Sequence, residues 1–187
     1  MRVIAGIAKG RVLVAPRGTG TRPATDRIRE TLFGILEPDL PGTRVLDLFA
    51  GAGTLGIEAL SRGAAHATFV ERSADALAAL RKNLKTTAFE DRSDLVPANV
   101  LAYLEHALAV PYDIVFCDPP FADVAVLEAV LERLPGARAI LPDGMVIARV
   151  LKKHRPQLPV GVNLARTKEI GEEALLFLRY DAAGGGG

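Results

Sequence analysis

The chain has 187 residues, 49% of them apolar, and a formal net charge of +1. It is long enough to bury one hydrophobic core, so we expect one main domain. No apolar run approaches the roughly 18 residues that a membrane-spanning helix needs, and the first residues, MRVIAGIAKGR, are too polar for a secretory signal. We therefore expect a cytoplasmic protein without membrane contact.

The single cysteine, Cys117, excludes an internal disulfide, and no group of cysteines and histidines has the spacing of metal ligands. The sequence therefore predicts no metal site. We expect Cys117 to be a buried packing residue, because no base or cation near it in the sequence would activate its thiol.

The first 30 residues carry seven Lys or Arg against two acidic residues, a local charge of +5 against about −4 for the remaining residues. Residues 1–15 alternate loosely around Lys9-Gly10, which predicts a hairpin of two short strands. Residues 16–24 form a connector rich in Gly, Pro and Thr. A basic arm suits a polyanion such as nucleic acid, although a charged and solvated surface would have the same composition.

A helix is predicted over residues 25–37, with Thr25 as its N-cap and Pro38 as its end. Helices and strands then alternate. The predicted strands are 43–49, 66–71, 93–98 and 112–118, and the predicted helices are 54–61, 73–86, 100–107 and 123–134. This alternation indicates parallel βαβ units in a doubly wound α/β sheet.

Three further strands are predicted at 144–150, 159–166 and 173–180. The link between the last two is short and permits only an antiparallel pair, so we expect the sheet to end in a hairpin. Residues 182–187 have low complexity, and we expect a disordered tail.

The segment VLDLFAGAGTLGIEAL (45–60) combines a strand, a glycine turn and the start of a helix. Gly51, Gly53 and Gly56 have the spacing of a dinucleotide-binding loop. Glu71 lies 20 residues after Gly51, at the end of the next predicted strand, where an acid can bind a ribose diol. We therefore expect a nucleotide-like ligand at this loop.

Asp47 separates the two cofactors that fit such a loop. A carboxylate just ahead of the loop would repel the pyrophosphate of NAD at the helix N-terminus, but it would favour the cationic groups of S-adenosylmethionine. The same carboxylate could instead cap the glycine loop, which is compatible with either cofactor. Asn99, after the third strand, could meet an adenine edge or cap the helix that follows.

The segment YDIVFCDPPF (112–121) ends an apolar strand with an acid, two prolines and an aromatic residue. Proline fixes its own φ and favours an extended residue before it, so the turn is rigid at the strand end where α/β sheets bind ligands. Asp118 and the Pro119 carbonyl could accept both hydrogens of a nucleobase amine, without competition from an N–H of Pro119 or Pro120, while Phe121 stacks on the base. The alternative is a plain turn with Phe121 in the core.

These motifs together resemble the S-adenosylmethionine-dependent methyltransferases, specifically the bacterial family that methylates N2 of a guanine in 16S ribosomal RNA, known as RsmD. The resemblance covers almost the whole chain and rests on RVIAGIAKGR, TRPATDRIRETLFGIL, LDLFAGAGTLGIEALSRGA, VERS, ANVLAYL and FCDPPF. It implies a Rossmann-like class I methyltransferase fold, with a seven-stranded, mainly parallel sheet and an antiparallel last strand. It also implies an arm and connector at 1–24, followed by a methyltransferase domain at 25–181.

The resemblance further assigns roles to individual residues. The implied cofactor contacts are Asp47, Phe49, Ala50, Gly51, Gly53, Glu71, Asn99 and Asp118. The implied catalytic turn is Asp118, Pro119, Pro120 and Phe121. The implied RNA contacts are Arg2, Lys9, Arg11, Arg22, Arg27 and Arg29. The implied partner is 16S ribosomal RNA, within the small ribosomal subunit or its precursor.

Other functions remain compatible with the sequence. A methyltransferase acting on an amine of another RNA or DNA base would need the same catalytic turn. An NAD-dependent oxidoreductase would share the glycine loop and Glu71, and a non-enzymatic RNA-binding module would share the basic arm. A second basic cluster could extend an RNA footprint or belong to a solvated strand end; its residues are Arg149, Lys152, Lys153 and Arg155.

Overall fold

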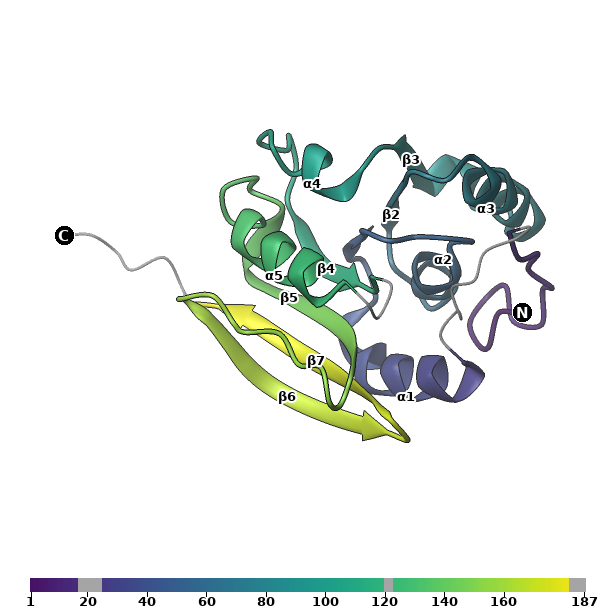
Figure 1. Ribbon diagram of the computed structural model, residues 1–187. Coiled ribbons are helices and arrows are strands. Elements are labelled where there is room, and N and C mark those ends of the chain that lie inside the picture. Colours follow the sequence, from purple (N-terminus) through teal and green to yellow (C-terminus); the bar gives the residue numbers. More distant parts are fainter. Residues whose placement is uncertain (17–24, 120–122, 182–187) are drawn as a thin grey trace. The chain divides into compact units, whose positions relative to one another are not determined.

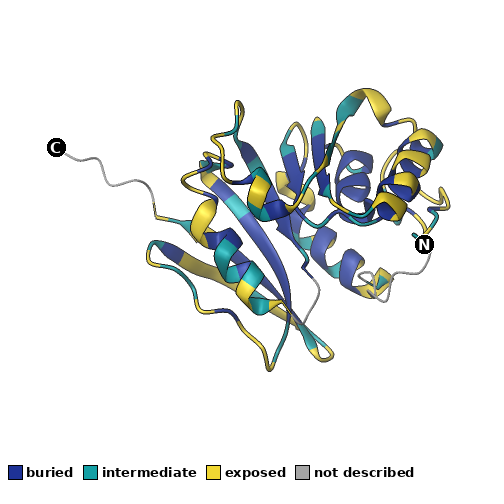
Figure 2. Cartoon of the chain, turned by 45° about the horizontal axis from the view of Figure 1, so that its top comes forward, coloured by how far each residue is buried: buried dark blue, intermediate teal, exposed yellow. Residues whose placement is uncertain are grey.

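The computed structural model describes residues 1–16, 25–119 and 123–181 (Figure 1). Its contacts divide the chain into two compact units, Met1–Val100 and Leu101–Gly187. Each unit has strands whose buried side chains, dark blue in Figure 2, form its hydrophobic core. The predicted disordered tail, 182–187, lies outside the described residues.

Three parallel strands form the sheet of the first unit. The central strand β2 (His66–Glu71) pairs with β1 (Arg44–Asp47) on one side and with β3 (Ser93–Pro97) on the other. Helices α2 (Thr54–Ser61) and α3 (Ala74–Thr87) connect them, because parallel neighbours need a crossover. The predicted strands and helices are confirmed here, although β1 is shorter than predicted.

Helix α1 (Asp26–Leu36) begins as the sequence indicates. The Thr25 side chain accepts the N–H of Ile28, which satisfies one of the free donors of the first turn. The helix buries Ile28, Leu32, Phe33 and Leu36. A short 3-10 helix, η1 (Glu37–Asp39), follows and contains Pro38, so the helix ends where it was predicted to end.

The predicted hairpin of residues 1–15 is reduced to a single antiparallel bridge between Arg2 and Val12. The backbone N–H groups that would extend the ladder point elsewhere: Ala8 donates to Ser61 Oγ at 3.0 Å, and Ile7 donates to the Ser61 carbonyl at 2.8 Å. The segment therefore lies against α2 rather than forming two independent strands.

Gly6 allows this close approach. Its φ is +79°, and a Cβ at this position would lie 1.8 Å from the Ser61 carbonyl oxygen. A residue with a side chain would thus face both an unfavourable backbone conformation and a collision with the helix. Gly6 therefore lets the N-terminal segment pack against α2 more closely than a residue with a side chain would allow.

The second unit contains four strands. Strand β4 (Tyr112–Cys117) is parallel to β5 (Ile140–Leu151), and β7 (Glu173–Tyr180) is antiparallel to both β5 and β6 (Val162–Ile170). The unit also holds helix α5 (Val124–Arg133), and the short helix α4 (Val100–Tyr103) starts at the boundary. Residues 171 and 172 link β6 to β7, which confirms the predicted terminal hairpin.

Strand β5 begins four residues earlier than predicted. Pro142 and Gly144 are turn-forming residues in sequence, but they lie in the strand, where the pairing with β4 shifts between Tyr112 and Ile114. A bulge accommodates Pro because it interrupts the regular ladder. A Cβ on Gly144 would lie 2.5 Å from Cγ1 of Ile140, so this bulge is tightly packed.

The strands follow the order β3-β2-β1-β4-β5-β7-β6. This order, with β7 antiparallel to its neighbours, confirms the predicted seven-stranded, mainly parallel sheet. In the described part of the chain, no helix is long and apolar enough to cross a membrane.

Candidate cofactor loop, acidic turn and basic surface

The three glycines of the loop after β1 are required for different reasons. Gly51 and Gly53 have φ values of +53° and +80°, which L side chains rarely adopt. Gly56 has an ordinary φ, but a Cβ there would lie 2.3 Å from Cε1 of Phe69 on β2. The first two glycines therefore shape the turn, and the third lets α2 pack closely against the strand.

Glu71, at the end of β2, is bonded directly to this loop. Its Oε2 accepts the N–H of Gly51 at 2.9 Å, and its Oε1 accepts the N–H groups of Arg72 and Ser73, each at 2.8 Å. A carboxylate has about four lone-pair positions, so acceptor capacity remains after these three bonds. The structure thus brings the predicted ribose acid and the glycine turn together.

Asp47 is buried, with 1% of its surface exposed, and its Oδ2 accepts the N–H of Gly56 at 3.1 Å. The loop-capping role considered for this carboxylate is therefore present in the structure. Capping is compatible with a cofactor contact, because a carboxylate fixed in this way still places negative charge beside the loop. Its direct contact with a cofactor stays a prediction.

The other predicted cofactor residues of the first unit follow strands β1 and β3. Phe49 is half-buried, and Ala50 is buried and donates its N–H to the Val70 carbonyl at 3.1 Å. Asn99 is exposed and immediately precedes α4. Ala50 is thereby tied to β2, whereas the roles of Phe49 and Asn99 stay predictions.

The predicted catalytic turn begins in the second unit with Asp118 and the buried Pro119, directly after β4. Pro120 and Phe121 lie outside the described residues. Cys117, the last residue of β4, is 1% exposed, as a packing cysteine should be. Among the described residues, no group of three or more His, Cys, Asp or Glu side chains could hold a metal.

Asp118 forms an ion pair with Arg149, which the sequence analysis had grouped with a basic cluster. Nε of Arg149, on β5, donates to Oδ1 of Asp118 at 2.6 Å, and Nη1 of Arg149 lies 3.2 Å from Oε2 of Glu173 on β7. Burial raises the pKa of Asp118, and the nearby Arg149 partly opposes this shift. The acid of the turn is therefore one end of a buried charge network.

The predicted basic cluster at 149–155 loses one member in the structure, while Lys153 is exposed and its contact with RNA stays a prediction. Arg149 is 7% exposed. Lys152 and Arg155 both pair with Glu169, at 3.0 and 2.9 Å. One sequence signal pointed to this outcome, because Arg149 stands alone within the apolar run MVIARVL of a strand expected to be buried, and a buried charge needs a partner.

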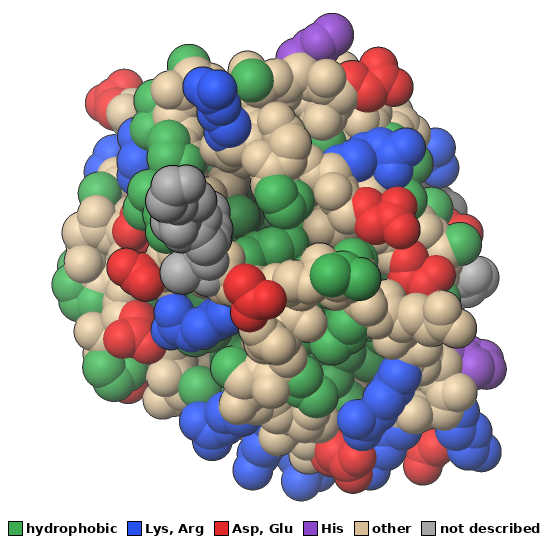
Figure 3. Space-filling model, turned by 90° about the vertical axis from the view of Figure 1, so that its left-hand side faces the viewer, with side chains coloured by type: hydrophobic (Ala, Val, Ile, Leu, Met, Phe, Trp, Pro, Cys, Tyr) green, Lys and Arg blue, Asp and Glu red, His purple; other side chains and the backbone are tan. Residues whose placement is uncertain are grey.

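The predicted RNA contacts differ in accessibility. The exposed ones are Arg2, Lys9, Arg11 and Arg27. Exposed apolar side chains accompany them, since Ile7 is 79% and Val12 is 70% exposed. Arg22 lies outside the described residues. On the face drawn in Figure 3, which is the left-hand side of the view in Figure 1, Lys and Arg side chains are interspersed with Asp and Glu.

The predicted RNA contact of Arg29 is wrong, because this residue is fully buried. Its Nη2 donates to Oδ1 of Asp26 at 2.7 Å and to the Arg2 carbonyl at 2.9 Å. A guanidinium inside the fold cannot reach a phosphate on the surface. Arg29 therefore holds the N-terminal segment against α1 instead of contacting RNA.

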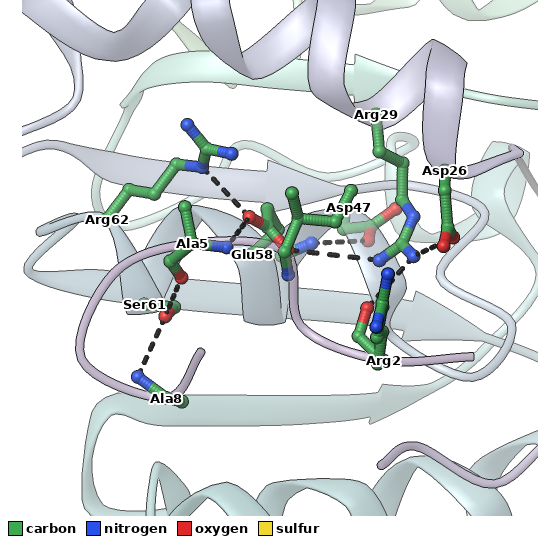
Figure 4. A network of polar contacts seen from close by, with 11 residues as sticks. Arg2, Ala5, Ala8, Asp26, Arg29, Asp47, Glu58, Ser61 and Arg62 are labelled. Carbon is green, nitrogen blue, oxygen red and sulfur yellow. Dashed lines mark hydrogen bonds and ion pairs between the residues drawn. The ribbon is translucent and has the colours of Figure 1, made fainter. Parts of the chain in front are cut away.

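Glu58 on α2 is the acidic centre of the same network (Figure 4). Its side chain is fully buried and accepts the N–H groups of Ile4 and Ala5, at 2.8 and 3.0 Å. Nε of Arg62 donates to it at 2.9 Å, and Nη1 of Arg29 lies 3.8 Å away. Glu58 was not among the predicted functional residues, because a glutamate in a helix is usually exposed.

Comparisons with known proteins cover nearly the whole chain. The family model described as "Conserved hypothetical protein 95" matches residues 1–179. Ribosomal RNA small subunit methyltransferase D from Escherichia coli (strain K12) is 36% identical over 185 residues, which are 98% of this chain and 92% of that protein.

Solved structures of methyltransferases are also similar to this chain. The structure of yhhF from Escherichia coli, 36% identical, matches with a TM-score of 0.86 over 97% of this chain and 98% of that chain. A ribosomal protein L11 methylase from Lactobacillus delbrueckii subsp. bulgaricus shares the fold at 18% identity, with a TM-score of 0.64 over 82% of this chain and 79% of that chain.

The similarity therefore extends from the N-terminal segment through the glycine loop and the acidic turn to the terminal hairpin. The fold is that of the class I methyltransferases. The resemblance to the RsmD methyltransferases is thereby confirmed, and the chain belongs to the family of ribosomal RNA small subunit methyltransferase D, whose model is described as "Conserved hypothetical protein 95".

Proposed function

We propose that the chain is an S-adenosylmethionine-dependent methyltransferase that methylates the exocyclic N2 amine of one guanine in 16S ribosomal RNA, within the small subunit or its precursor. The observation that carries this proposal is the end of β4, where Asp118 is fixed by Arg149 directly before a buried proline. A rigid acceptor at a strand end suits a planar amine. The proposed reaction takes place in the cytoplasm, where ribosomal RNA is processed.

The residues around the glycine loop fit the proposed cofactor. Gly51 leaves open space where a Cβ would stand, so a ligand can approach the backbone closely. Glu71 retains acceptor capacity for a ribose diol, and Asp47 provides negative charge for an ammonium group. S-adenosylmethionine, when bound, supplies an electrophilic methyl group on sulfur.

The catalytic turn would act by orientation. The lone pair of a guanine N2 amine is delocalised into the ring, which makes the amine a weak nucleophile. If Asp118 and the Pro119 carbonyl each accept one amine hydrogen, the lone pair is localised on nitrogen and directed at the methyl group. Phe121 would stack on the base after the base has left its neighbours.

Methylation mapping tests the proposal directly. Ribosomal RNA or 30S particles from cells that lack this protein are incubated with the purified protein and labelled methyl donor, and the methylated base is located. We expect one N2-methylguanine in 16S RNA. Asp118→Ala should abolish transfer but leave RNA binding intact. A methyl group on an amine of another base would replace the guanine assignment, and no transfer to any ribosomal RNA would refute the function.

The cofactor is tested by calorimetry. We expect S-adenosylhomocysteine to bind to the protein and NAD to show no heat of binding, because Asp47 places a negative charge beside the loop that would repel a pyrophosphate. Tight binding of NAD without binding of S-adenosylhomocysteine would instead favour an oxidoreductase.

The basic surface is tested by salt dependence. Charge reversal at Lys9 and Arg11, which are both exposed, should weaken RNA binding and reduce the salt slope by about one unit per lost phosphate contact. Arg133→Glu, a reversal of an exposed arginine on α5, is the matched control and should leave the slope unchanged. Equal effects of all three reversals would exclude a specific RNA contact by the N-terminal segment.

A further inference from the structure

Three charged residues on neighbouring strands of the second unit form a continuous chain of ion pairs. Asp118 follows β4, Arg149 lies on β5 and Glu173 begins β7. The parallel register pairs Cys117 with Ala148, so the next residues, Asp118 and Arg149, are neighbours. The guanidinium lies 2.6 Å from Oδ1 of Asp118 through Nε and 3.2 Å from Oε2 of Glu173 through Nη1.

This network is largely shielded from water. The side chains of Arg149, Asp118 and Glu173 are 8%, 14% and 17% exposed. A guanidinium that donates in two directions from a planar fork has little rotational freedom. Glu173 therefore fixes one end of Arg149, and the other end fixes the carboxylate of Asp118.

We propose, relying on the function proposed above, that Arg149 is a positioning residue for methyl transfer: it holds Asp118 by Oδ1 and directs Oδ2 toward the amine of the target base. The amine then donates one hydrogen bond to Oδ2 and the other to the Pro119 carbonyl. When the nitrogen takes the methyl group, the carbon–sulfur bond of the donor would break to leave S-adenosylhomocysteine, and the one surplus proton would pass from the nitrogen to Oδ2. Arg149 touches neither the base nor the cofactor in this arrangement and acts through Asp118.

The charges around Asp118 predict in which direction each variant shifts the pKa of Asp118. Burial raises its pKa most strongly, the charge and hydrogen bond of Arg149 lower the pKa, and the charge of Glu173 raises it. Loss of Arg149 should therefore move the titration of Asp118 to higher pH, and loss of the Glu173 charge should move it to lower pH. Asp123 and His154 line the pocket that Pro119 and Arg149 share. Neither is among the groups that shift the pKa of Asp118, so His154→Gln serves as a control.

The first experiment needs neither RNA nor cofactor. The carboxyl carbon of Asp118 is followed by ¹³C NMR as a function of pH, with Asp118→Asn used to assign its signal. We expect an upward shift of the titration in Arg149→Gln, a downward shift in Glu173→Gln and no shift in His154→Gln. Thermal unfolding shows whether each variant is folded. If Arg149→Gln does not fold, the downward shift in Glu173→Gln carries the test, and its absence refutes the proposal.

The second experiment measures methyl transfer. Because small misplacements of a catalytic group are costly, Arg149→Gln should lower kcat about 100-fold, with KM for RNA changed less than about threefold. Arg149→Lys should recover part of the loss. In an Asp118→Asn background, whose neutral amide needs no counter-ion, the Arg149→Gln change should cost less than about threefold.

The outcomes separate the two proposals. If the wild-type protein methylates ribosomal RNA but Arg149→Gln leaves both kcat and the titration of Asp118 unchanged, the positioning role is refuted and the function stands. An equal loss in the wild-type and Asp118→Asn backgrounds would also refute it, since a purely structural arginine would act in both. If the titration shifts as expected but the wild-type protein transfers no methyl group, the proposed function fails, and the positioning role fails with it.

Discussion

Replacing Glu58 by Gln should be among the most destabilising single changes in the first unit. The side chain is fully buried and accepts three hydrogen bonds, from the N–H groups of Ile4 and Ala5 and from Nε of Arg62. Glutamine keeps the shape but presents an NH₂ group to one set of these donors. It also removes the negative charge that lies 3.8 Å from the buried Arg29 guanidinium.

The magnitude follows from these contacts. Removing one partner of a buried ion pair typically costs about 3–5 kcal/mol, because the other charge stays buried without compensation. For a chain of this size, each kcal/mol lowers Tm by roughly 2–4 °C. We therefore expect Glu58→Gln to lower the free energy of unfolding by about 3–5 kcal/mol and Tm by about 6–20 °C.

Urea unfolding and amide exchange check this prediction. The matched control is Asp26→Asn, which removes the other acidic partner of Arg29; its side chain is 51% exposed, so it should cost at most about 1 kcal/mol. In Glu58→Gln, the amides of Ile4 and Ala5 should exchange faster than in the control. The reasoning is refuted if Glu58→Gln costs no more than Asp26→Asn, or if these amides stay protected.

Three further predictions concern the same unit. Gly56→Ala should destabilise the protein by about 1–3 kcal/mol in urea unfolding, and Phe69→Leu should offset part of the loss, because the added Cβ meets that ring. Asn83→Ala should speed amide exchange at Val14, since the buried Asn83 bonds both the N–H and the carbonyl of Val14 and also the Ala52 carbonyl. The hydrogen bond and charge of Arg29 lower the pKa of Asp26. Because protonation of Asp26 removes the ion pair, the stability difference between wild type and Asp26→Asn should disappear as the pH falls through that lowered pKa. A difference that persists at lower pH would exclude the ion pair as its cause.

The order of the elements could be predicted from the sequence because it depends on local patterns. Helix α2 and strand β2 have the predicted bounds, Thr54–Ser61 and His66–Glu71. Their apolar periods, glycines and caps lie within the segments themselves. Strand β5 was predicted to begin too late, at residue 144, because Pro142 is a turn residue locally and only the pairing with β4 places it in a bulge.

Local alternation predicted the antiparallel return of residues 1–15, which the bridge between Arg2 and Val12 confirms, but not how short the pairing is. The N–H groups of Ile4 and Ala5 are taken by the Glu58 carboxylate, which lies 54 and 53 residues away in the chain. Such contacts depend on how α2 lies against the segment. Alternation along residues 1–15 carries no information about that packing.

The sequence by itself determined the succession of strands and helices, the glycine loop with its two acids, the acidic turn and the family. Only the tertiary structure decided which charged residues are exposed. Arg29 and Arg149 read as surface cations in sequence, yet both are buried beside carboxylates. The physical reason is that burying a charge is tolerated only with a partner. Asp26 lies near Arg29 in the chain, but Glu58 and Asp118 come from distant segments that the fold brings together.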